Sequence, residues 1–374
     1  MTYPKQIHIN IDVTNKCDRN CIHCASNSDL KNPIDISCEK VERLLKEIRR
    51  INSTVFLSLT GGGEPLMNEQ LPDIVKMVYN FQGTKKFSLV TSGFLDNDIE
   101  KKRLKKTVKN APDYKKFKFC LSLHSFNSKA MERFEETFKF LLDSGPKNFC
   151  VKTTVAPSDD IHSRLEKLFE KYKVYPFSIG HDVWQRFKTR VFTKKVYDED
   201  FENDSLVGFA HLFDYWYVCP DKKKLILVST QFLSPQGRAK NLKCKMFSMH
   251  RACSAIFRER LTDFHIDSNG SYFPSGYCNT KTYPHMTIGT LDEKIERIID
   301  KRRIFVKNML GLIISDKRLY DRKNDLCSLC SKIKAEQDAL ATKLIKGGDN
   351  DGRTITGRTY WAEQTRQYIW NKLE

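Results

Sequence analysis

The sequence of 374 residues contains no long hydrophobic run. Its longest apolar candidate is MLGLII at 309–314, which is far short of the roughly 20 residues that a membrane-spanning helix needs. The N-terminal stretch MTYPKQIHIN lacks a charged region followed by an apolar one, so no secretory signal peptide is predicted. We therefore expect a cytoplasmic protein with no membrane partner, in a compartment where thiols stay reduced.

The chain nevertheless has 12 cysteines. A disulfide framework is not expected in a reducing compartment, and clustered cysteines in such proteins more often bind metal. Four of the cysteines stand apart in apolar stretches and are predicted to be small core residues: Cys38, Cys120, Cys150 and Cys219. Metal binding is expected of the remaining, clustered thiols.

The formal net charge is +18, and a basic excess of this size can indicate a polyanionic partner. The lysines, however, are spread along the whole sequence, and no single stripe of arginine and aromatic residues stands out. The pattern favours a solvated basic surface over a nucleic-acid-binding face.

Strand and helix patterns alternate through the first half of the chain. Strands are predicted at 6–14, 54–60, 85–92, 117–124, 149–157 and 175–182, and helices between them at 36–51, 68–81, 97–110, 128–143 and 161–172. Such a repeat predicts a parallel sheet with helices on its outside. Ligands of these sheets gather at the carboxyl ends of the strands, where the cysteine-rich loop, the glycine run and the turn at 91–93 all fall.

The second half is less regular. Residues 183–224 contain an aromatic-rich stretch predicted to be an acidic-capped helix of an inserted element, and 223–233 is predicted to be a strand. We expect a core domain over 1–240, a smaller, loop-rich and cysteine-rich unit over 241–332, and a helical tail over 333–374.

The stretch NKCDRNCIHCASN (15–27) places Cys17, Cys21 and Cys24 in the spacing C-x3-C-x2-C. Three thiolates on one loop can each bind one iron of an iron–sulfur cluster. A structural zinc site would need a fourth ligand, and the nearest, His23, lies between two of the cysteines. Three protein ligands leave one iron open to chelate a cosubstrate. Zinc binding and a chance trio of cysteines are the alternatives.

This motif resembles the signature of the radical S-adenosylmethionine (radical SAM) enzymes. In that family the signature lies in the loop after the first strand of a partial (β/α)6 TIM-like barrel, and the resemblance implies the same fold here. The resemblance implies that Cys17, Cys21 and Cys24 hold a [4Fe–4S] cluster whose fourth iron is chelated by the amino and carboxylate groups of S-adenosylmethionine. His23 then matches the aromatic residue that commonly precedes the last cysteine and would lie in the cofactor site.

The segment LTGGGEPL (59–66) resembles the family's GGE motif after the second strand. Glycines at a strand end let the backbone approach a ligand, and a glutamate can accept from an ammonium. The resemblance places Gly62, Gly63 and Glu64 beside the amino group of S-adenosylmethionine. Two further strand ends are similar to family segments: Ser92 stands where asparagine is usual, and Ser122 would lie near the ribose.

Beyond residue 236 the sequence resembles the auxiliary domain of the SPASM/twitch subgroup. The matching features are GRA at 237–239, Ile266–Asp267, Gly270 and Pro274, GTL at 289–291, and a final C-x2-C. Ser275 stands where the family usually has cysteine. The resemblance implies a second, auxiliary [4Fe–4S] cluster with the ligands Cys253, Cys278, Cys327 and Cys330. Cys244 is an alternative ligand, and zinc or purely structural cysteines are alternative explanations.

The resemblance implies an enzyme that reductively cleaves S-adenosylmethionine to a 5′-deoxyadenosyl radical, which abstracts hydrogen from a substrate. We expect a peptide substrate, modified as by a maturase, and an electron donor such as flavodoxin or ferredoxin. A small-molecule or nucleotide-derived substrate is the alternative. A non-catalytic metal-cluster module that binds nucleic acid is a further one, and it predicts salt-dependent affinity for RNA or DNA without cofactor cleavage.

Overall fold

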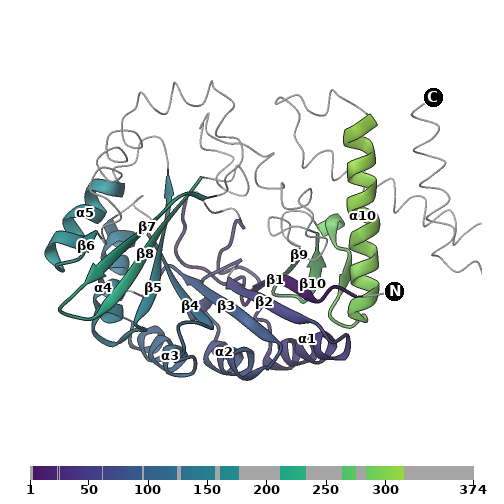
Figure 1. The fold of residues 1–374 in the computed structure, drawn as a ribbon, viewed down its shortest axis with the longest axis horizontal. Helices are drawn as coiled ribbons and strands as arrows, with labels where there is room; N and C mark the ends of the chain where they lie inside the picture. Colours follow the sequence, from purple (N-terminus) through teal and green to yellow (C-terminus); the bar gives the residue numbers. More distant parts are fainter. Residues whose placement is uncertain are drawn as a thin grey trace, which may run out of the picture.

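The computed structural model describes residues 3–22, 24, 26–60, 62–94, 97–123, 128–155, 161–176, 211–232, 263–274 and 284–315. Its centre is a sheet of strands whose outer face is covered by helices (Figure 1). Six neighbouring strands run parallel: β1 (Gln6–Asp12), β2 (Thr54–Thr60), β3 (Thr84–Thr91), β4 (Phe117–Leu123), β5 (Asn148–Val155) and β8 (Lys224–Phe232). The predicted α/β class with a parallel, partial-barrel core is confirmed.

Helices alternate with the first five strands: α1 (Cys38–Arg50), α2 (Leu71–Asn80), α3 (Asp98–Lys109), α4 (Ser128–Ser144) and α5 (Ile161–Lys171). In α1 the buried residues Val41, Leu44, Leu45 and Ile48 recur at helical spacing and face the sheet. The hydroxyl of Ser37 caps this helix by accepting from the amide of Lys40 at 3.3 Å.

Each parallel strand has one face under the helices and one face turned to the inside of the barrel. On β4, Phe117, Phe119 and Leu121 belong to the main core, because side chains alternate along a strand. Cys120 and Ser122 therefore lie on the inner face. Cys120 packs there in a small separate cluster with Cys150 of β5.

The sixth parallel strand differs from the prediction. Residues 175–182 were expected to complete the parallel set, but the described part, β6 (Tyr175–Pro176), pairs antiparallel with β7 (His211–Cys219) at the edge of the sheet. Residues 177–182 lie outside the described residues. β8, predicted separately as a strand over 223–233, takes the place beside β5. Pro176 fits an edge because proline has no amide hydrogen for a second neighbour.

The expected aromatic-rich helix in the insertion is also wrong over residues 211–219. This stretch, HLFDYWYVC, forms β7, which runs antiparallel to β8 along its length. Aromatic side chains favour strands because they pack well against cross-strand neighbours. The remaining residues of the predicted insertion up to 210 lie outside the described residues.

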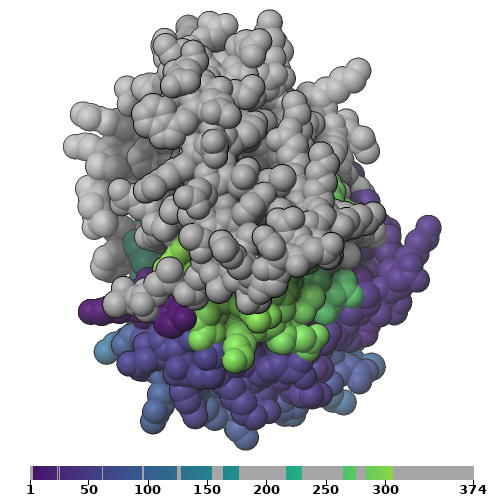
Figure 2. All heavy atoms as spheres, turned by 90° about the vertical axis from the view of Figure 1, so that its right-hand side faces the viewer, coloured from purple at the N-terminus to yellow at the C-terminus, as the bar shows by residue number. Residues whose placement is uncertain are grey.

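A C-terminal hairpin extends the sheet beyond β1. β9 (Asp263–Ile266) pairs parallel with β1 and antiparallel with β10 (Ser271–Phe273), which pairs with β11 (Gly289–Thr290). Gly270 has φ of +87°, a left-handed conformation that suits glycine in a turn. Segments that are far apart in the sequence thus meet in space. Figure 2 shows the green C-terminal part directly against the purple N-terminal part.

The structure also contains a helix that the sequence analysis did not predict, α10 (Ile295–Ser315). Its first half buries Ile295, Ile298, Ile299, Arg302 and Phe305. This spacing is helical, so the signal was present in a region interpreted as loop-rich. None of the helices in the described part of the chain is both long and apolar enough to cross a bilayer.

Candidate functional site

The cysteine loop begins directly after β1 and rests on the glycine turn that follows β2. The amide of Gly63 donates to the carbonyl of Thr14 at 2.7 Å, and the amide of Glu64 donates to the carbonyl of Lys16 at 2.7 Å. A Cβ atom on Gly63 would lie 1.9 Å from the carbonyl oxygen of Lys16. Glycine at position 63 therefore lets the two loops lie backbone against backbone.

The three cysteines of the loop are half-buried thiols that form no disulfide within the described residues. The amide of Cys17 donates to the carbonyl of Asp29 at 3.0 Å, and the amide of Cys24 donates to the carbonyl of Cys21 at 3.2 Å. The pKa of the Cys17 thiol is raised to about 12, chiefly by burial; a hydrogen bond from the amide of Arg19 opposes the rise, and the charges of Glu64, Cys21 and Cys24 contribute to it. The predicted His23 lies outside the described residues.

This donor set fits an iron–sulfur cluster. Thiols are the soft ligands that such clusters take, and all three lie on one short loop, at positions 17, 21 and 24. Within the part of the chain that the structure describes, no three histidine, cysteine or acidic side chains come close enough together to hold a single metal ion. A cluster spreads its ligands over separate iron corners and does not need that convergence.

Glu64 links the end of β2 to the end of β3. Its side chain is only 3% exposed, and its two oxygens accept four hydrogen bonds. One oxygen accepts from the amide of Leu66 at 3.1 Å and from the hydroxyl of Thr91. The other accepts from the amide of Ser92 at 2.8 Å and from its hydroxyl at 2.6 Å. The carboxylate thus fixes the glycine turn and the turn at 91–93 against each other.

The structure brings most of the predicted cofactor residues to one rim. Ser92 contacts Glu64 directly, and the glycine turn that carries Gly62 seats the cysteine loop. Ser122 lies at the same end of the sheet, on the inner face of β4, in register with Lys152 of β5. These placements agree with a shared site at the carboxyl ends of the strands, while the roles of the individual residues stay predictions.

Two pairs of interacting residues near this rim were not predicted from the sequence. Asp12, the last residue of β1, accepts from the hydroxyl of Thr60 at 3.2 Å and pairs at 3.2 Å with Nε2 of His265 on β9. Burial alone would lower the pKa of His265, but the charge and hydrogen bond of Asp12, together with Asp267, raise it above its usual value. No periodicity or spacing links these residues, because they are brought together by strand pairing alone.

Arg19 and Glu100 are the second missed group. Arg19 stands within the cysteine motif, yet its guanidinium is buried and forms an ion pair of 2.8 Å with Glu100 of α3. Both side chains are less than a tenth exposed. An arginine between two predicted ligands is conspicuous in the motif, but its partner is a helix residue 81 positions away.

The inner face of the barrel also carries a pair of thiols. Cys120 and Cys150 are directly opposite each other on β4 and β5, and both are buried. The hydrogen bond from Cys150 lowers the pKa of Cys120, against the effect of burial, and the charges of Lys152 and Lys118 lower it further. Both were predicted to be small core residues, and their burial confirms this prediction.

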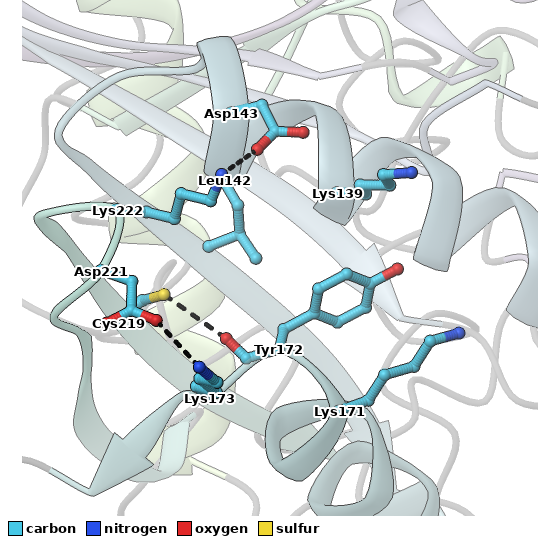
Figure 3. Close-up of a pocket in the computed structure, with 9 residues that line it drawn as sticks. All are labelled: Lys139, Leu142, Asp143, Lys171, Tyr172, Lys173, Cys219, Asp221 and Lys222. Atoms are coloured by element: carbon cyan, nitrogen blue, oxygen red, sulfur yellow. Dashed lines mark hydrogen bonds and ion pairs between the residues drawn. The ribbon is translucent and has the colours of Figure 1, made fainter.

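A cavity of about 320 Å³ lies elsewhere, at the opposite ends of the strands (Figure 3). It is formed where α4 and α5 end and where β7 turns into β8. Lys222 pairs there with Asp143 at 2.7 Å, and Lys173 with Asp221 at 3.4 Å, while the Cys219 thiol on its wall donates to the carbonyl of Tyr172 at 3.5 Å. Because its walls come from the ends of α4 and α5 and from the β7–β8 turn, the cavity is not part of the rim described above.

The predicted ligands of the auxiliary cluster lie outside the described residues. These are Cys253, Cys278, Cys327 and Cys330, together with the alternative Cys244. The hairpin that the resemblance placed among them does form, as β9 and β10. The auxiliary cluster itself stays a prediction.

Sequence comparisons identify the N-terminal part of the chain. The family model described as "Radical SAM superfamily" matches residues 11–167. A 7,8-dihydro-6-hydroxymethylpterin dimethyltransferase of Methanocaldococcus jannaschii is 32% identical over 98 residues, which are 26% of this chain and 19% of that protein. A probable GTP 3′,8-cyclase of Archaeoglobus fulgidus is 30% identical over 88 residues, 24% of this chain and 28% of that protein. The matches thus span less than a third of either relative.

Solved structures with distant similarity include Streptococcus suis SuiB bound to the precursor peptide SuiA. It has a TM-score of 0.47 and 16% identity, with 89% of this chain and 71% of that chain covered. BtrN in complex with AdoMet and 2-DOIA has a TM-score of 0.40 and 15% identity, with 82% of this chain and 87% of that chain covered. The family match covers residues 11–167, less than half of the chain, and this segment is therefore similar to the radical SAM domain, whose family uses a [4Fe–4S] cluster and S-adenosylmethionine.

Proposed function

We propose that Cys17, Cys21 and Cys24 hold the [4Fe–4S] cluster and that this enzyme cleaves S-adenosylmethionine to a radical that abstracts hydrogen from an organic substrate. The cluster and its cosubstrate supply the one-electron chemistry when bound. The chain's own residues seat the cluster loop on the glycine turn and hold that turn through Glu64. The observation that carries the proposal is the three-thiol loop packed backbone to backbone on residues 62–64.

Anaerobic reconstitution tests this assignment. The wild-type protein should bind iron and sulfide and release 5′-deoxyadenosine and methionine from S-adenosylmethionine under dithionite. Cys17→Ala should abolish the release, whereas Cys38→Ala, which removes a half-buried thiol on α1, should not. Replacement of all three loop cysteines should lower the iron count from about eight to about four atoms per chain if the auxiliary cluster is present. Unchanged release of 5′-deoxyadenosine by Cys17→Ala would refute the ligand assignment.

The first substrate class we propose is a peptide. The support is the similarity of the C-terminal segment to the SPASM/twitch pattern, including the β9–β10 hairpin closed at Gly270. With a labelled peptide as substrate, deuterium should move from the abstracted C–H position into 5′-deoxyadenosine. The same label transfer identifies the position attacked.

A phosphate-bearing small molecule is the second candidate, and one structural observation favours it. Lys118 and Lys152 lie on neighbouring strands and both charges act on the inner-face thiol of Cys120. A lysine ammonium is a common phosphate ligand. The two curated relatives are named for a pterin and for GTP as their substrates. Lys152→Met should then raise KM for a nucleotide substrate and leave the uncoupled cleavage of S-adenosylmethionine unchanged. An unchanged KM would favour the peptide.

A further inference from the structure

Arg19 lies between the first two cysteine ligands, and its two ends have different partners. Its amide donates to the sulfur of Cys17. Its side chain leaves the loop and enters the protein, where it is only 4% exposed. The residue therefore joins a ligand sulfur to the interior of the domain.

The buried guanidinium of Arg19 donates four hydrogen bonds within the described residues. Nη2 donates to Glu100 at 2.8 Å and to the carbonyl of Gly93 at 2.9 Å, Nε donates to the hydroxyl of Ser92 at 3.2 Å, and Nη1 donates to Asp18. A buried charge is costly unless it is paired and hydrogen-bonded in this way. The carboxylates around it outweigh the effect of burial and raise the pKa of Arg19.

The hydroxyl of Ser92 connects this arginine to Glu64. It accepts from Arg19 and donates to Glu64 at 2.6 Å, so a shift of the guanidinium would be felt at the glycine turn. Glu100 is itself held at the start of α3, where the side chain of Asn97 caps the helix by accepting from the amide of Glu100 at 3.1 Å. The result is a continuous chain from α3 to the cysteine loop and the glycine turn.

Ser92 is also the position where the family pattern leads one to expect asparagine. Serine carries a hydroxyl where asparagine carries the larger carboxamide, and the guanidinium reaches both this hydroxyl and the carbonyl of Gly93. Gly93 has φ of +85°, and a Cβ there would lie 2.3 Å from Oγ1 of Thr137, so this turn cannot move outward to make room. Arg19 and Ser92 therefore fit each other.

We propose that Arg19 is a positioning residue of the cluster loop, which fixes the main chain between Cys17 and Cys21 through its ion pair with Glu100 and its hydrogen bonds to Ser92 and Gly93. The inference rests on the proposed role of the three cysteines as cluster ligands. A merely structural ion pair would stabilise the fold without affecting how the loop retains iron. The two roles can be separated, because a buried pair can be replaced by two apolar side chains with little loss of stability, whereas removal of one partner is costly.

The test compares Arg19→Met with Arg19→Met/Glu100→Met. Thermal unfolding of the apo protein and the rate of iron loss to a chelator are measured for each reconstituted variant. The single variant should melt well below the wild type. The double variant should regain most of the melting temperature yet lose iron about tenfold faster than the wild type, in line with the effect of other groups that orient metal ligands. Recovery of both properties in the double variant would overturn the proposal.

Two further variants complete the experiment. Arg19→Lys keeps a charge opposite Glu100 but loses the planar fork, so it should fold and still release iron several-fold faster; wild-type retention would overturn the proposal even if the methionine variants did not fold. Lys106, on α3 like Glu100, forms an exposed ion pair with Asp73 of α2, and Lys106→Met should change neither property. A wild type that binds no iron would refute the proposed function, and the positioning role with it, whereas variants that match an iron-loaded wild type refute only the positioning role.

Discussion

Replacement of Gly63 by alanine should dislodge the cysteine loop. The added Cβ would lie 1.9 Å from the carbonyl oxygen of Lys16 and 2.7 Å from the carbonyl carbon of Asn15. Both obstacles are backbone atoms, so no side-chain rotation can relieve the overlap. The two hydrogen bonds of 2.7 Å that join the loops would have to lengthen. Overpacking of a tight site costs about 1–3 kcal/mol, occasionally more, and we expect about 3 kcal/mol here.

Gly62→Ala is the matched control, because its Cβ would meet a carboxylate oxygen of Asp12 at 2.9 Å and the nearest backbone atom, the carbonyl oxygen of Thr14, at 3.6 Å, so a shift of a few tenths of an ångström in one side chain relieves the contact. We expect a loss of about 1 kcal/mol or less for it. Denaturant unfolding of both apo variants gives the stability, and iron content after reconstitution reports the state of the loop. Equal stability and equal iron content in Gly63→Ala and the wild type would refute the packing of the two loops described above.

Three further outcomes are expected. Glu64→Gln places an amide among donors that need an acceptor and should cost about 2 kcal/mol in denaturant unfolding; a change within error would show that Thr91 and Ser92 do not depend on this carboxylate. Asn68→Ala removes a buried amide that donates to the carbonyls of Val13 and Ile36, of which the first still accepts from the amide of Ile36, and should also cost about 2 kcal/mol, measured in the same way. Because Asp12 raises the pKa of His265 above 6.5, the stability from this pair is complete below about pH 6.5 and is lost as pH rises through the higher, folded-state pKa. As the pH rises above about 6.5, the wild type should therefore lose more stability than His265→Gln, and parallel pH profiles would contradict the pairing.

The parallel core could be predicted from the sequence because each element carries its own pattern. Strand β2 was predicted at its observed ends, and α1 within two residues, since Ser37 caps it and its apolar residues keep one period. The motifs of the cysteine loop and glycine turn were equally local. What these motifs share is that the information lies within a few consecutive residues.

The rest depends on contacts between distant segments. Nothing in the sequence pairs Arg19 with Glu100 or Asp12 with His265, because these contacts arise only when α3 and β9 take their places. The edge position of β6 likewise depends on β7, whose aromatic residues suit either a buried helix or a strand when seen alone. Glu64 was predicted as a ligand for an ammonium, but its four bonds to the protein show an anchoring role that only the folded loops reveal.

The pairing of β9 with β1 has a consequence for how this chain is made. During synthesis β1 emerges first, yet His8 and its neighbours meet their partners around Asp263 only after most of the chain has left the ribosome. Contacts so far apart in sequence slow folding, because a long loop must close before they form. Until then β1 exposes a bare hydrogen-bonding edge, of the kind that recruits other chains. Expression at low temperature or with added chaperones should therefore raise the soluble yield by protecting the nascent protein during this wait.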